Sequence, residues 1–164
     1  MHRRDSIPAK PEPRAAAITQ LTLTVFRLNG MLLHWGDQVV EPLGLTSARW
    51  QMLGALALAS TPLTAPQVGE AMGVTRQGAQ KQLKLLLEQG LVAARPNPAH
   101  MRSPLYALTP QGRTLYQQAD ALGAAMADEL ASLIPVANAR TAIRTLETML
   151  RQLQIATLSS EVES

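Results

Sequence analysis

The sequence feature that most constrains the fold is an apolar stripe near the start of the chain. Apolar residues recur there at alternating spacings of three and four, which places them on one side of a long helix. The seven residues are Ile18, Leu21, Val25, Leu28, Leu32, Trp35 and Val39. A helix in any bundle can bury such a face. Because two more amphipathic helices close the chain and aromatic residues make up only 3% of it, we expect more apolar surface than one copy covers, and hence a homodimer.

The amino-acid composition limits the possible fold classes and the cellular compartments in which the protein is expected. The 164 residues suit one domain, and abundant leucine and alanine favour helices over a sandwich or barrel. With no cysteine, disulfides, thiolate metal sites and cysteine nucleophiles are excluded. The longest uninterrupted apolar runs have about eight residues, as in Met52 to Ala59, whereas a membrane-spanning helix needs about 20. We therefore expect no membrane partner, no signal peptide and a cytoplasmic protein.

The middle of the chain carries the signals of a helix-turn-helix. Pro42 and Gly44 end the first helix, and Thr46 or Ser47 caps a second helix. The side chains that this second helix turns inward are Trp50, Leu53, Leu56 and Ala57. Thr64 and Gln67 form a capping box for a short helix at about 65–72, which Gly73 stops before Thr75 caps the next.

A hairpin and two closing helices follow. The fourth helix covers about 76–89 and ends at Gly90, and two short strands are expected at 92–95 and 105–108 across a loop that contains prolines. Thr109 and Pro110 cap a fifth helix, which Pro135 breaks before a sixth. The apolar faces of these two helices are Leu115, Leu122, Met126, Leu130 and Leu133, then Ile143, Leu146, Leu150 and Leu153.

These signals predict a mostly α protein, a winged helix-turn-helix domain with long N- and C-terminal dimerisation helices. We expect a disordered tail at 1–15, a single domain at 16–158 and a frayed tail at 159–164. Within the domain, 16–45 and 110–158 are the dimerisation helices and 46–109 is the winged helix-turn-helix.

The fourth helix has two chemically different sides. At about 100° per residue, its polar residues share roughly 140° of arc, opposite Ala79, Leu83 and Leu86. The polar set is Arg76, Gln77, Gln80, Lys81 and Lys84. Glutamine can bond the adenine edge, arginine and lysine the guanine edge, and lysine also neutralises phosphate. A plain solvated surface is the alternative, although residues 59–110 hold five basic and two acidic groups, the most basic part of the chain.

Catalytic chemistry has no support in the sequence. The three histidines lack metal-ligand spacing, and the common nucleophile, zinc-protease and phosphate-loop motifs are absent. We expect no enzyme, no catalytic residue, no metal and no cofactor.

The set of motifs resembles the MarR family of winged helix-turn-helix regulators. The resemblance rests on Thr64 to Thr75, on Leu86 to Val92 and on Leu108 to Arg113. It implies a homodimer that places each fourth helix in a major groove and each wing in the flanking minor groove. Many relatives also bind a small phenolic or aromatic ligand, and the resemblance puts that pocket near His34, Trp35 and Trp50. Core packing is the simpler interpretation of these three residues.

The wing departs from the family pattern. Where relatives often show Asp-Arg-Arg, this chain has His100-Met101-Arg102, so Arg102 is kept while the carboxylate is replaced. A guanidinium suits the negative potential of a narrow minor groove. His100 can strengthen phosphate binding when protonated, although a lone loop histidine is more often simply solvated.

The sequence therefore predicts a sequence-specific, DNA-binding transcriptional regulator, a homodimeric repressor of a palindromic operator that a small aromatic ligand releases. The expected DNA contacts are Thr75, Arg76, Gln77, Gln80, Lys81, Lys84, Arg95 and Arg102. The alternative is a winged-helix module that uses the same surfaces to bind proteins, without sequence-specific DNA binding.

Overall fold

The computed structural model describes residues 14–162, and side chains as far as 156. Their elements are α1 (Arg14–Val40), the 3-10 helix η1 (Glu41–Leu43), α2 (Ser47–Leu58), α3 (Ala65–Met72), α4 (Arg76–Glu88), β1 (Val92–Arg95), β2 (Leu105–Leu108), α5 (Pro110–Leu133) and α6 (Val136–Val162). The chain divides within α5 into two compact units, Met1–Ala119 and Asp120–Ser164. The mostly helical fold with a small sheet is the one predicted.

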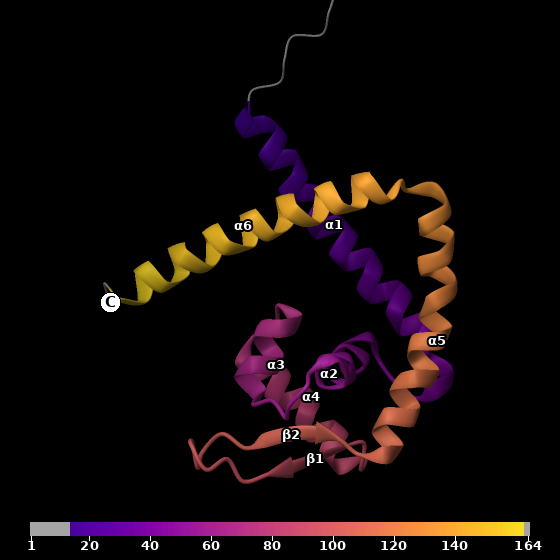
Figure 1. The fold of residues 1–164 in the computed structure, drawn as a ribbon, viewed down its shortest axis with the longest axis vertical. Helices are drawn as coiled ribbons and strands as arrows, with labels where there is room; N and C mark the ends of the chain where they lie inside the picture. The colour runs from indigo at the N-terminus through magenta and orange to yellow at the C-terminus, as the bar shows by residue number, and fades with distance from the viewer. Residues whose placement is uncertain (1–13, 163–164) are drawn as a thin grey trace, which may run out of the picture. The chain divides into compact units, whose positions relative to one another are not determined.

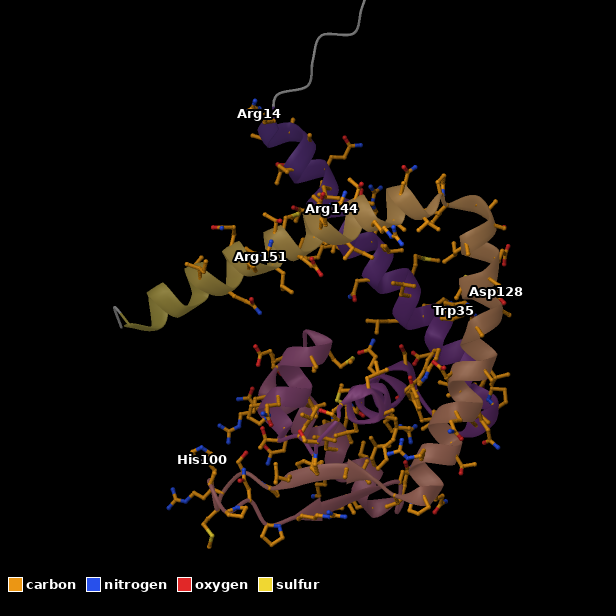
Figure 2. The ribbon with its side chains drawn as sticks, viewed as in Figure 1. Arg14, Trp35, His100, Asp128, Arg144 and Arg151 are labelled. Carbon is orange, nitrogen blue, oxygen red and sulfur yellow. The ribbon has the colours of Figure 1, made fainter. Side chains whose placement is uncertain are left out.

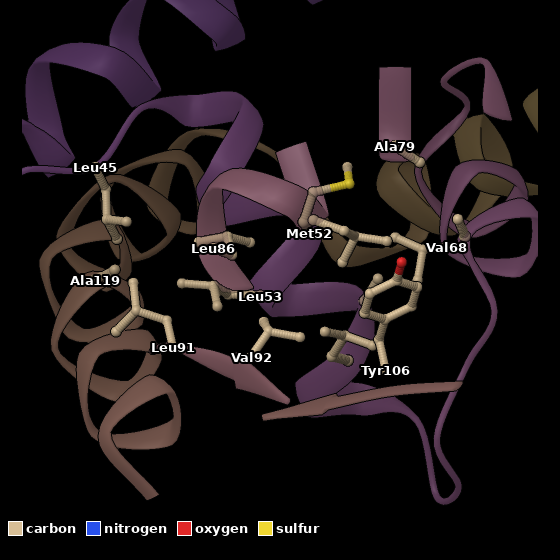
Figure 3. Packing of buried hydrophobic residues seen from close by; sticks show 14 of the residues in the cluster. Leu45, Met52, Leu53, Val68, Ala79, Leu86, Leu91, Val92, Tyr106 and Ala119 are labelled. Atoms are coloured by element: carbon tan, nitrogen blue, oxygen red, sulfur yellow. The ribbon is translucent and has the colours of Figure 1, made fainter. Parts of the chain in front are cut away.

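The core of the first unit lies where α2, α3 and α4 gather beside the β1–β2 hairpin (Figure 1). Figure 3 shows side chains from these elements packing together, with Met52 and Leu53 of α2 beside Leu86 of α4 and Tyr106 of β2. Leu53 and Leu56 are buried as predicted, whereas Trp50 and Ala57 are only half-buried. Met52 and Ala55, which the pattern did not select, are also buried because α2 is covered on more than one side.

Local capping accounts for most of the element boundaries. Thr46 caps α2 by accepting a hydrogen bond from the backbone N–H of Arg49, and Gly44 ends η1 in the left-handed region at φ 67°. Asp37 of α1 also accepts a hydrogen bond from the Ser47 N–H, with 2.6 Å between oxygen and nitrogen. The start of α2 is thus fixed by its own cap and by the end of α1.

The antiparallel hairpin pairs Val92 with Leu108 and Arg95 with Leu105. A further antiparallel bridge joins Leu63 to Tyr106, so the segment before α3 pairs with β2 at this position. The sequence analysis did not predict this pairing. After β2, Thr109 links three elements. Its N–H donates to the Leu91 carbonyl, its hydroxyl donates to the Gly90 carbonyl, and the same oxygen caps α5 by accepting from the Gly112 N–H.

The two ends of the chain differ from expectation. Helix α1 starts at Arg14, inside the tail predicted for 1–15, and residues 1–13 lie outside the described residues. Helix α6 continues to Val162, past the start of the tail predicted for 159–164.

Most of α1 is uncovered in the single chain. Only Gly36 and Val40 of this helix are buried, and Ile18, Leu28 and Leu32 of the predicted stripe are between 46% and 54% exposed. Leu23 and Phe26, on other sides of the helix, are exposed as well. By length and composition alone, Arg14–Leu43 is apolar enough to cross a membrane. The sequence analysis expected no membrane-spanning helix because the uninterrupted apolar runs are short. The average hydropathy of α1 does not support that expectation.

Gly112 provides a test of how tightly α5 is packed. A Cβ atom at this position would overlap the Leu91 backbone carbonyl, which cannot move without breaking its bond with Thr109. We expect Gly112→Ala to lower the free energy of unfolding by about 3 kcal/mol, measured by urea denaturation. Gly54→Ala is the matched control. Its Cβ would meet the Tyr116 ring at an ordinary 3.5 Å, so it should be neutral or stabilising by up to about 1 kcal/mol. Equal stability of the two variants would contradict the close approach.

Candidate nucleic-acid interface

The turn between α3 and α4 fixes where α4 begins. In the capping box of α3, the Gln67 side-chain oxygen accepts a hydrogen bond from the Thr64 N–H at 2.8 Å. Gly73 then takes a φ of 65°, and the Val74 N–H donates to the Gly69 carbonyl at 2.9 Å. This turn needs the left-handed conformation that glycine adopts without strain. The helix-turn-helix predicted from these residues is thereby confirmed.

Helix α4 starts at the cap that the sequence predicted. The Thr75 hydroxyl oxygen accepts a hydrogen bond from the Gly78 N–H at 3.0 Å. Its hydroxyl hydrogen can still be donated outward, because a hydroxyl is both donor and acceptor. Thr75 is exposed, so it can cap the helix and contact a ligand at the same time.

The two sides of α4 are separated as the helical spacing predicted. Ala79, Leu83 and Leu86 have no exposed surface at all. The five polar residues of the opposite side, Arg76, Gln77, Gln80, Lys81 and Lys84, are all exposed. The buried side fixes the rotation of the helix about its own axis, so the polar side has one defined orientation.

Little negative charge opposes this polar face. Glu88, at the far end of the helix, is the only acidic residue of α4. Its carboxylate lies 3.9 Å from the Lys84 ammonium, with both side chains largely exposed. An exposed pair of this kind contributes at most about 1 kcal/mol, so Lys84 can exchange it for another anion.

The loop between β1 and β2 is held by its own hydrogen bonds. Asn97 is one of two buried polar residues among those described, and its side-chain amide donates to the Ser103 carbonyl at 2.9 Å. Its side-chain oxygen accepts from the Ala99 N–H. The His100 N–H donates to the Asn97 carbonyl, and the Ser103 N–H donates to the His100 carbonyl. Sequence reasoning missed Asn97, although asparagine beside two prolines is a common signal for such a turn.

A hollow of about 540 Å³ lies between this loop and the starts of α3 and α4. Its lining is Thr64, Pro66, Arg76, Ala99, His100, Met101, Arg102 and Ser103. The structure thus brings two predicted DNA contacts, Arg76 and Arg102, to one concave surface. Arg95 is exposed at the end of β1 and is not part of this lining. Figure 2 shows His100 at the end of the hairpin loop, away from the core.

The three candidate ligand-binding residues separate into two environments. Trp35 of α1 and Trp50 of α2 are half-buried, with ring centroids 6.1 Å apart and planes tilted by 47°. This distance is typical of a packed aromatic pair. His34 is exposed on α1. The tryptophans therefore have a packing role in joining α1 to α2, and a ligand contact remains a prediction for all three.

A family model and a curated relative both match this chain. Residues 43–103 match the model of the MarR family. An uncharacterised protein of Mycobacterium tuberculosis is 42% identical over 100 residues, which cover 61% of this chain and 68% of that protein.

Solved structures extend the likeness to nearly the whole chain. The crystal structure of a MarR family transcription regulator is 25% identical, with a TM-score of 0.67, over 90% of this chain and 95% of that one. A mutant MarR of E. coli, complexed with operator DNA, has the same fold at 22% identity, with a TM-score of 0.65 over 87% of this chain and 99% of that one. The chain has the fold of the MarR-type transcriptional regulators and belongs to the MarR family.

Proposed function

We propose that this protein is a sequence-specific, DNA-binding transcriptional regulator that acts as a homodimer. The observation that carries the proposal is the polar face of α4, exposed along its length while Ala79, Leu83 and Leu86 are fully buried behind it. Further support comes from the E. coli MarR structure, which is described as a complex with operator DNA. A helix presented in this way fits the width of a major groove.

The residues of this face divide by what their side chains can recognise. Gln77 and Gln80 read base edges, because a side-chain amide can donate to and accept from adenine. Arg76 serves a guanine edge or a phosphate, while Thr75, Lys81 and Lys84 bind phosphates. Phosphate contacts set the position of the helix in the groove, and base contacts select the sequence.

The wing supplies the second contact. Arg102 lies in the loop between β1 and β2 and Arg95 at the end of β1, and both are exposed. We place Arg102 in the flanking minor groove, where its guanidinium meets the negative potential of a narrow A·T-rich segment. Arg95 neutralises a neighbouring phosphate.

Dimerisation accounts for the apolar surface that one chain leaves uncovered. Helix α1 is apolar on several sides, which is typical of a helix enclosed by other protein or by lipid. Helix α6 likewise exposes Ile143, Leu150 and Leu153. We propose that these faces cover one another in a dimer. Two-fold symmetry then requires a palindromic operator with half-sites about one helical turn apart.

The regulation that fits these surfaces is repression by occupancy in the cytoplasm. A dimer on its operator blocks access to the DNA without any chemical step. A small aromatic ligand that binds near His34, Trp35 and Trp50, where α1 meets α2, would release the operator by changing how the DNA-binding elements are held. The protein-binding alternative uses the same basic face and is an outcome of the first experiment below.

Selection from a randomised duplex library tests the proposal directly. We expect enrichment of a palindrome, and an affinity for it that falls by the order of 10³ between about 50 and 200 mM salt, because several phosphates per dimer are contacted. Fluorescence anisotropy with the selected and the scrambled duplex measures both properties. Weak binding without any sequence preference would favour the protein-binding alternative.

Single substitutions on α4 separate base readout from phosphate binding. We expect Gln77→Ala or Gln80→Ala to cost about 1 to 3 kcal/mol on the selected duplex and to relax base preference at one position. Lys84→Ala is the contrasting variant, which should weaken all duplexes alike and reduce the salt slope by about one. Equal losses on selected and scrambled DNA for all three variants would refute the assigned roles.

A charge on the stripe of α1 tests the dimer. Leu28 is 54% exposed in the single chain, so Leu28→Glu should leave the fold intact and oppose association by burying a carboxylate at the interface. Sedimentation equilibrium should show monomers at concentrations where the parent chain is dimeric. Gln20→Glu is the matched control, since it introduces the same charge on the polar side of the helix, which Gln20 shares with Arg27 and Gln38. A dimer that survives Leu28→Glu would place the interface elsewhere, and association only with detergent or lipid would favour a membrane role for α1.

A further inference from the structure

The charged groups on the hollow beside the wing are all basic or titratable to a positive charge. Arg76 comes from the start of α4, while His100 and Arg102 come from the wing loop. The remaining lining residues are uncharged, including the hydroxyl-bearing Thr64 and Ser103. No carboxylate is among the lining residues, so an anion entering the hollow meets no opposing charge from them.

We propose that His100 is a DNA phosphate contact whose protonation makes the affinity for the operator depend on pH. The DNA backbone crosses the hollow between α4 and the wing, and the imidazolium joins Arg76 in neutralising it, while Arg102 reaches into the adjacent minor groove. This inference rests on the proposed DNA-binding function and adds a regulatory property to the same surface.

The loop gives the His100 side chain a defined place. Its backbone N–H donates to the Asn97 carbonyl at 3.1 Å, and its carbonyl accepts from the Ser103 N–H at 2.9 Å. These two bonds hold the backbone on both sides of the residue, and Asn97 anchors the loop from the buried side. The imidazole itself is exposed and lines the hollow, so it can reach a ligand there without rearrangement of the loop.

The sign of the pH effect follows from the charge that DNA brings to the hollow. A phosphate bound there favours the protonated form of the His100 ring. The complex therefore binds more protons than the free components, and by linkage the affinity for DNA falls as pH rises through the range in which histidine titrates, about pH 5 to 8.

The size of the effect is bounded by the same linkage. One charge-assisted contact between an exposed imidazolium and a phosphate corresponds to about a 3- to 10-fold change in affinity for each wing. Exposure and salt screening place this protein toward the lower end of that range. A dimer with two wings on the operator multiplies the change.

The test compares duplex binding at about pH 6 and pH 8 and constant ionic strength, by anisotropy of the fluorescently labelled duplex obtained from selection. For the parent chain, we expect binding at the lower pH to be tighter by at least about 3-fold. His100→Gln should bind with the weaker affinity at both pH values, because its side chain carries no charge. His100→Arg should bind with the stronger affinity at both.

Met101→Gln is the matched control, since it introduces the same amide into the adjacent loop position and leaves the imidazole in place. It should keep the pH dependence of the parent chain. Circular dichroism at both pH values establishes that every variant is folded.

The possible failures are distinguishable. A parent chain with equal affinity at both pH values, or a His100→Gln variant that keeps the pH dependence, would overturn the role of His100 while leaving the DNA-binding function standing. Failure to bind any duplex at either pH would overturn the proposed function, and this inference with it.

Discussion

The complete burial of one side of α4 is the constraint on which the rest of the molecule depends. Ala79, Leu83 and Leu86 pack into the core formed by α2, α3 and the hairpin. A rotation of α4 by one residue position would expose these side chains and bury charged ones, at a cost of several kcal/mol. The helix therefore cannot turn to suit a ligand. Whatever binds its polar face must accept the arrangement of arginine, glutamine and lysine that the core imposes.

The same core sets the positions of the turn and the wing. Gly73 and Thr75 connect α3 to α4 at a fixed angle, while Thr109 bonds to the Gly90 and Leu91 carbonyls at the point where α4 passes into the hairpin and α5. The two ends of α4 are thus each joined to a neighbouring element by hydrogen bonds. The base of the hairpin and α4 are therefore linked by these hydrogen bonds, and side chains from the wing loop and from α4 line one hollow.

Sequence reasoning predicted the parts of the fold that depend on near neighbours in the chain. The capping box at Thr64, the left-handed Gly73, the cap at Thr75 and the limits of both strands follow from local backbone chemistry and were correct. The bridge from Leu63 to Tyr106 joins residues that are far apart in the sequence, so no local sequence pattern predicts it.

The candidate site was predicted to a similar extent. The exposed side of α4 follows from helical periodicity, whereas the hollow that unites Arg76 with Arg102 depends on how the loop folds back toward α3. The DNA contacts themselves remain predictions, because exposure and charge define a surface but not its partner. The sequence analysis underestimated the apolar character of α1. It counted uninterrupted apolar runs, which single polar residues cut short, although the average hydropathy of the helix is high.

The self-contained bonding of the wing loop has a consequence for how such a protein can diverge. Asn97 and the backbone groups of His100 and Ser103 maintain the bend of the loop, and the side chains of His100, Met101 and Arg102 take no part in those bonds. Substitutions at the three tip positions therefore leave folding nearly untouched. Substitutions there can change which groups the wing presents, while the packing of α4 against the core stays the same.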